Sequence, residues 1–69
     1  MSRAQDVRRR TIETIIRVLE DTEGNTVAII ANAPGMRDVT PDAADISAVK
    51  AALREMRDAM AVLMSTEVH

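Results

Sequence analysis

The chain has 69 residues, no cysteine, a single histidine, no Phe, Tyr or Trp, and a formal net charge of −2. These features exclude disulfides, thiolate metal sites and aromatic platforms for stacking nucleic-acid bases. The 9 basic and 11 acidic residues are mixed along the chain, without the basic excess typical of nucleic-acid binders. So short a chain forms one domain and buries only about 60% of the surface that unfolding exposes, so we expect self-association to stabilise it.

The first predicted helix spans residues 2–22, with Ser2 at its N-cap and Gly24-Asn25 as its stop. One face is charged and places Asp6 and Arg10 four residues apart, as in helical ion pairs. The apolar face covers about half the circumference, which is wider than the roughly 100° typical of a helix with one neighbour. That face carries Arg8, Ile12, Ile15, Ile16 and Leu19, flanked by Ala4, Val7, Thr11 and Val18.

The second predicted helix spans residues 41–65, with Thr40 at the N-cap and Pro41 at the first helical position. Its apolar residues recur every three or four positions, which is the heptad spacing of helices packed side by side. We call this set the seam; it consists of Ile46, Val49, Leu53, Met56, Met60 and Leu63. We expect Ile12, Ile15, Ile16 and Leu19 to complete the core or dimer interface, and residues 66–69 to form a frayed tail.

The connector between the two helices contains a short apolar run, Val27–Ile30. Its β-branched residues favour a strand and the neighbouring alanines favour a helical turn, so both remain open for residues 26–32. Pro34-Gly35 predicts a type II turn.

We therefore predict a mainly all-α fold in which residues 1–69 form a single helical hairpin with a semi-ordered connector. Two antiparallel helices alone leave apolar stripes in water, at about 25 cal/mol per Å². Pairing two hairpins into a dimeric four-helix bundle buries both stripes. The rival is a compact monomer in which residues 26–33 fold over the hairpin.

Motifs for catalysis, metals or cofactors are missing from the sequence, so we do not expect an enzyme or a bound cofactor. No apolar run is long enough for a membrane span, and the Arg-rich start lacks the apolar stretch of a signal peptide. We therefore expect a cytoplasmic protein.

Two segments are candidate binding surfaces for another protein. The first is the basic N-terminus, in which Arg8 falls within the apolar arc, and the second is the connector, because long loops in small domains are often functional. The residues concerned are Arg3, Arg8, Arg10, Met36, Arg37, Asp38 and Val39.

The sequence thus favours a small non-catalytic regulator or inhibitor that acts as a homodimer on a larger protein. Its size and architecture are similar to those of phage and bacterial accessory regulators, which is an analogy of fold only. One alternative is a nucleic-acid-binding helical dimer, a transcriptional regulator or RNA binder, that uses the N-terminal arginines. The acidic residues interleaved with those arginines disfavour it. The other alternative is a structural or assembly component.

Overall fold

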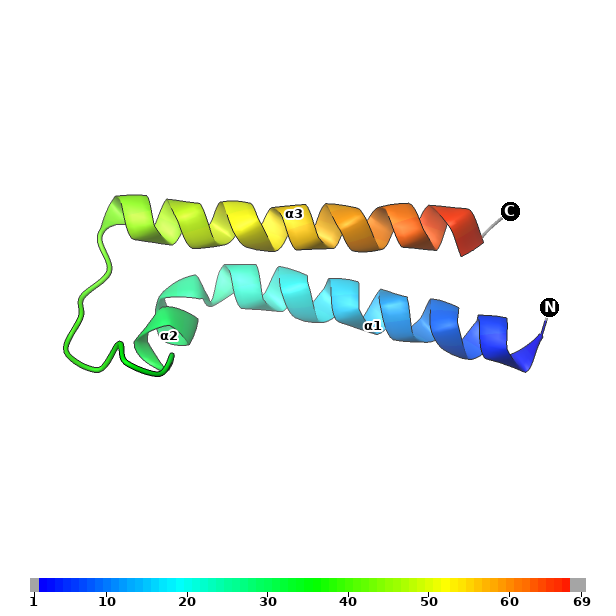
Figure 1. Cartoon of the computed structure of the whole chain (residues 1–69), viewed down its shortest axis with the longest axis horizontal. Helices are drawn as coiled ribbons and strands as arrows, with labels where there is room; N and C mark the ends of the chain where they lie inside the picture. The colour runs from blue at the N-terminus through cyan, green and yellow to red at the C-terminus, as the bar shows by residue number, and fades with distance from the viewer. Residues whose placement is uncertain (1, 68–69) are drawn as a thin grey trace.

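The computed structural model describes residues 2–67, which form three helices and no strand (Figure 1). The helices are α1 (Arg3–Gly24), α2 (Thr26–Ala31) and α3 (Ala43–Glu67). α1 and α3 pack lengthwise in opposite directions, and α2 lies at the end where the connector joins them (Figure 1). The mainly helical fold is confirmed, while the dimeric bundle stays a prediction.

α1 begins and ends where local sequence predicts. The Ser2 hydroxyl accepts a hydrogen bond from the Gln5 amide, and the Gln5 side chain accepts one from the Ser2 amide, both at 3.2 Å. This capping box satisfies two backbone donors at the helix start. α1 ends at Gly24, and the amide of Asn25 donates to the Thr22 carbonyl at 3.0 Å.

The apolar run of the connector forms the helix α2, so the helical alternative is the correct one. Asn25, at φ −119° and ψ 29°, separates α2 from α1. The Thr26 hydroxyl donates to the Glu23 carbonyl at 2.6 Å, so it needs no other partner when buried. Thr26 and Ile30, one turn apart, are 2% and 8% exposed. A helical turn buries both, whereas a strand here would have no edge to pair with.

The start of α3 differs from the prediction. The helix begins at Ala43, and Asp42 rather than Thr40 takes the capping role. Asp42 Oδ1 accepts from the Asp45 amide at 2.8 Å, and Asp45 Oδ2 accepts from the Asp42 amide at 3.0 Å. The Asp pair prevails because two carboxylates satisfy two donors at the positive end of the helix.

At its other end α3 continues through Glu67, so the predicted tail is helical at residues 66 and 67. Residues 68 and 69 of that predicted tail lie outside the described residues.

The turn in the connector has the predicted geometry. The Met36 amide donates to the Ala33 carbonyl at 3.1 Å, and Gly35 has φ 82°. These are the hydrogen bond and the positive φ of a type II turn with Gly at its third position.

The core of the hairpin is thin. Among residues 2–67 the buried hydrophobic side chains are Ile12 and Ile30. The radius of gyration is 15.2 Å, against about 11 Å for a compact domain of this length. Cα extents of 50 × 18 × 16 Å describe a rod two helices wide. A rod of this shape buries one stripe of each helix and leaves the rest of each apolar arc accessible.

The predicted seam is only partly covered within the chain. Ile46, Val49, Leu53 and Met60 are half-buried, but Met56 and Leu63 are exposed, as is Ile15 on α1. A straight helix has 3.6 residues per turn, so its buried stripe drifts from a heptad pattern of 3.5. The half-buried Arg57 and Met64, which directly follow Met56 and Leu63 in the chain, therefore take their places in the contact with α1.

An ion-pair cluster fixes the height of α1 relative to α3, that is, its position along the common helix axis. The half-buried Glu23 accepts a hydrogen bond from Arg54 Nε and lies 3.9 Å from Arg57 Nη1. The two arginines hold the end of α1 against the middle of α3. Because they remain partly exposed, the cluster contributes modestly to stability, at about 1 kcal/mol or less.

We expect Glu23→Gln to lower the free energy of unfolding by up to about 1 kcal/mol, because it removes the charge that Arg54 and Arg57 share. Urea unfolding followed by circular dichroism measures the change, and 1 M NaCl should reduce the difference from wild type. Glu20→Gln, at an exposed carboxylate of the same helix, is the control. Equal effects of the two variants would contradict a specific role for Glu23.

The two glycines should respond oppositely to substitution by alanine. A Cβ at Gly24 or at Gly35 would meet no atom within 4 Å, so only the backbone conformation separates them. Gly35→Ala should cost about 1 kcal/mol because of its positive φ, and Gly24→Ala, in a helix, should add about 0.5 to 1 kcal/mol. Thermal unfolding of both variants checks this; equal shifts would contradict it.

Candidate protein-interaction surfaces

The N-terminal arginines are partly neutralised within α1. Arg9 Nη2 and Arg10 Nε contact the two carboxylate oxygens of Asp6 at 3.1 and 3.0 Å. Arg9 Nη1 also lies 3.8 Å from Glu13. The predicted binding residue Arg10 therefore already has a carboxylate partner, and this weakens the case for phosphate binding at this helix.

Hydrogen bonds from Arg9 and then Arg10 lower the pKa of Asp6 below its ordinary value of 3.8. Asp6 consequently stays ionised in mildly acidic solution. Arg3 and Arg8, the other predicted binding residues of this segment, are exposed on the same helix.

The predicted connector site is split by the structure. Met36 and Val39 help to line an open hollow of about 470 Å³, whose other walls come from α2, Ala33 of the connector and α3. Arg37 and Asp38 are exposed and are not part of its lining. Successive turns shape this segment, since the Val39 amide donates to the Met36 carbonyl at 3.1 Å. The full lining is Ile30, Ala33, Met36, Val39, Asp45, Ala48 and Val49.

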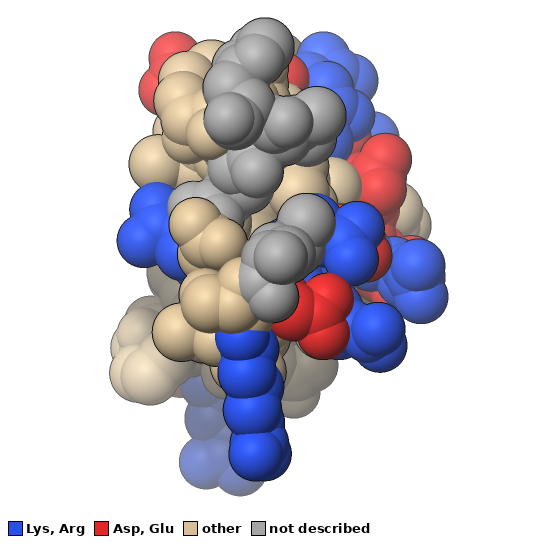
Figure 2. All heavy atoms as spheres, turned by 90° about the vertical axis from the view of Figure 1, so that its right-hand side faces the viewer, with Lys and Arg blue, Asp and Glu red and all other residues tan. Residues whose placement is uncertain are grey.

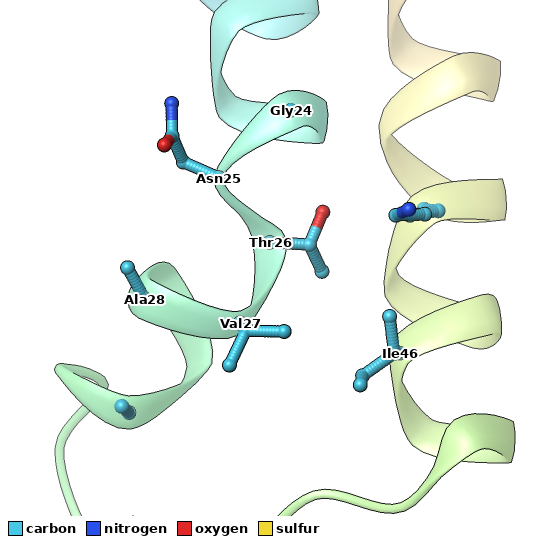
Figure 3. Close-up of a pocket in the computed structure, with 8 residues that line it drawn as sticks. Gly24, Asn25, Thr26, Val27, Ala28 and Ile46 are labelled. Carbon is cyan, nitrogen blue, oxygen red and sulfur yellow. The ribbon is translucent and has the colours of Figure 1, made fainter.

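A second hollow separates α2 from α3 (Figure 3). Thr26 and Ile46 project into it from opposite sides, while Asn25 and Ala28 point away (Figure 3). Lys50 is the charged residue of its lining. The other lining residues carry no ionisable side chain.

Exposed apolar residues of α1 and α3 form one continuous surface. At 100° per residue around the helix axis, these residues lie about 60–140° from the buried stripe of their own helix. The direction of this rotation is the same on α1 and on α3. Because the helices run in opposite directions with their buried stripes facing, equal rotations bring both sets to one side of the hairpin. We call this surface the apolar face; it consists of the half-buried Thr22 and the exposed Val7, Thr11, Ile15, Val18, Ala52, Met56, Ala59 and Leu63. The exposed Arg8 borders it near the start of α1.

The end-on view agrees with this division. Lys, Arg, Asp and Glu gather on the right of Figure 2, and the left carries mostly other residues. The two threonines fit the apolar face because their hydroxyls are used internally. Thr11 donates to the Val7 carbonyl at 2.8 Å and Thr22 to the Val18 carbonyl at 2.7 Å. Their methyl groups are thus the parts left to make contacts.

Sequence reasoning missed this surface. It assigned Met56 and Leu63 to the seam and Ile15 to the core or dimer interface, and it treated Val7, Thr11 and Val18 as a flank of α1 alone. The signal that could have found the face is the equal rotational offset on two antiparallel helices. At the connector end the face meets the first hollow, since Asp45, Ala48 and Val49 lie on the same side of α3.

Residues 2–67 contain no group of three or more His, Cys, Asp or Glu side chains placed to hold a metal ion. None of the three helices there combines the length and hydropathy needed to cross a membrane.

The carboxyl of Asp6 should titrate with a midpoint below 3.8, measured by NMR of its side-chain carbon. Arg10→Gln should raise that midpoint toward 3.8, and Arg3→Gln should leave it unchanged. Because folding lowers this pKa, the contribution of Asp6 to stability is present above pH 3.8 and is lost as pH falls through the folded midpoint. An unshifted midpoint in the wild type would contradict the observed pairing.

Comparison with known proteins gives no relative. No protein-family model matches the chain, and no curated protein or solved structure is significantly similar to it. Its function must therefore be inferred from the surfaces described above.

Proposed function

We propose that this chain is a small non-catalytic regulator or inhibitor that acts, as a homodimer, by binding a larger protein. The observation that carries the proposal is the open apolar hollow at the connector end. Exposed apolar surface that is concave and rimmed by polar residues is typical of protein-binding sites. Val39, at its rim, is 50% exposed.

The chemistry of the rim suggests what the hollow binds. Asp45 belongs to its lining, and Asp38 lies in the chain between Met36 and Val39. We propose that the target inserts an apolar side chain and places basic groups next to these carboxylates. Arg37, also exposed here, supplies a cation for an acidic group on the same target.

Affinity capture with matched variants tests the proposal. The tagged wild-type chain should retain one dominant protein, and Val39→Glu should reduce its recovery about tenfold, as expected for the loss of an apolar contact worth about 1.4 kcal/mol. Val62→Glu is the control, because Val62 is 64% exposed and lies outside both the hollow and the apolar face. Arg37→Ala should also reduce recovery.

Equal recovery with Val39→Glu and wild type would contradict the proposal. A salt-dependent gel shift of DNA or RNA by the wild-type chain, lost in Arg3→Ala, would favour the nucleic-acid alternative instead.

A further inference from the structure

The apolar face has no partner within the hairpin, and its position suggests what covers it. We infer that a second copy of this chain packs on it, with the two-fold axis parallel to the helices, so that α1 of each copy lies on α3 of its partner. This arrangement is a specific form of the homodimer in the proposed function, and only its biological role depends on that proposal.

The exposure of the apolar face calls for a partner. Val18 and Met56 are 56% and 53% exposed, although each lies in the middle of a long helix beside other apolar residues. Scattered exposed apolar residues are ordinary, but a continuous apolar surface of this extent on a small protein marks an interface.

The size of the face follows from the residues that define it. They extend from Val7 to Thr22 on α1, which is about 22 Å at 1.5 Å per residue, and from Ala52 to Leu63 on α3, which is about 16 Å. The hairpin is 16 to 18 Å across between Cα atoms. The projected area of the face is therefore less than about 400 Å², below the roughly 800 Å² that each partner buries in a stable complex, so we expect a weak, reversible dimer.

Two symmetric arrangements bring the faces together. A two-fold axis parallel to the helices places α1 on the partner's α3, twice. An axis perpendicular to them places α1 on the partner's α1 and α3 on the partner's α3. In both arrangements each helix has antiparallel neighbours, as in four-helix bundles.

Charge distinguishes the two arrangements. The outer edge of α1 is mainly basic, with Arg10 and Arg17 beside Asp21, whereas the outer edge of α3 carries Glu55 and Asp58. The parallel axis brings edges of opposite net charge together, with Arg17 about one helical turn from the height of the partner's Asp58, although Asp21 is level with that carboxylate. The perpendicular axis brings like edges together, which is unfavourable.

Side-chain size points the same way. α1 contributes the β-branched Ile15 and Val18 to the face, and α3 contributes the small Ala52 and Ala59. The Glu23 cluster sets the heights, since Glu23 is level with Arg54 and Arg57. Val18, five residues earlier in α1, is therefore about level with residues 59–62 of α3. A parallel axis preserves these heights, so Val18 of one copy meets the partner's Ala59.

The arrangement has a consequence for target binding. A parallel two-fold axis puts both connector hollows at one end of the bundle and both N-terminal arginine segments at the other end. The dimer would thus present two copies of the hollow side by side, and a single large protein could contact both.

Disulfide crosslinking tests the arrangement directly, because the chain has no cysteine of its own. We expect a mixture of Val18→Cys and Ala59→Cys chains, distinguished by a tag, to form the mixed disulfide at least about tenfold faster than either variant alone. Ala59→Cys alone should not crosslink, because the parallel axis places the two α3 helices diagonally across the bundle. Rapid self-crosslinking of Ala59→Cys would instead show paired α3 helices and overturn the inference.

Sedimentation equilibrium tests whether the apolar face is the interface. Val18→Asp should weaken dimerisation at least about tenfold, because a charge would be buried in the contact. Ala61→Asp, at an exposed residue on the side of α3 away from the face, should leave the dimer unchanged. Circular dichroism reports whether each variant stays helical. If Val18→Asp unfolds, the crosslinking experiment still tests whether the apolar face is the dimer interface.

A helical wild-type monomer at all concentrations would overturn the inference and leave the face to a different partner. The outcomes for the proposed function are separate. A dimer with the predicted disulfide that captures no protein through Val39 would refute the proposed function alone. Val39-dependent capture by a monomeric chain would refute the dimer alone.

Discussion

The structure depends on one geometric constraint, which is that each helix of a two-helix hairpin has a single long neighbour. One line of contact between α1 and α3 covers a stripe on each, although the apolar arc of α1 is about twice as wide as a stripe. Among the apolar residues of α1 and α3, burial is therefore nearly complete at Ile12 and partial or slight at the others. The remaining apolar residues gather on one side, because both arcs extend in the same rotational direction from the contact line.

Polar side chains fix the position of α1 along α3 and the junction between α1 and α2 in this thin hairpin. Glu23 and its two arginines fix how far α1 slides along α3, on the side opposite the apolar face. Thr26 satisfies its own hydroxyl and so can be buried where α1 gives way to α2. α2 and the connector then close one end of the hairpin and form the hollow. The hairpin thus has three distinct surfaces, which are a charged side, the apolar face and the hollow at the connector end.

Local sequence was informative wherever a few neighbouring residues decide the structure. The cap at Ser2, the stop at Gly24 and the turn at Gly35 each depend on hydrogen bonds or backbone angles within four residues. The prediction failed at Thr40 because Asp42, two residues later, forms a reciprocal cap with Asp45. That pairing is also local, and its Asp-x-x-Asp spacing was visible in the sequence.

The sequence by itself determined the helical class, the two long helices and the excess of apolar surface over what one hairpin can bury. The tertiary structure decided which residues carry that excess. Helix periodicity specifies a residue's angle only about its own helix axis, whereas exposure depends on where the neighbouring helix lies. For this reason Met56 and Leu63 left the predicted seam, and Met36 and Val39 joined a hollow that no sequence motif marks.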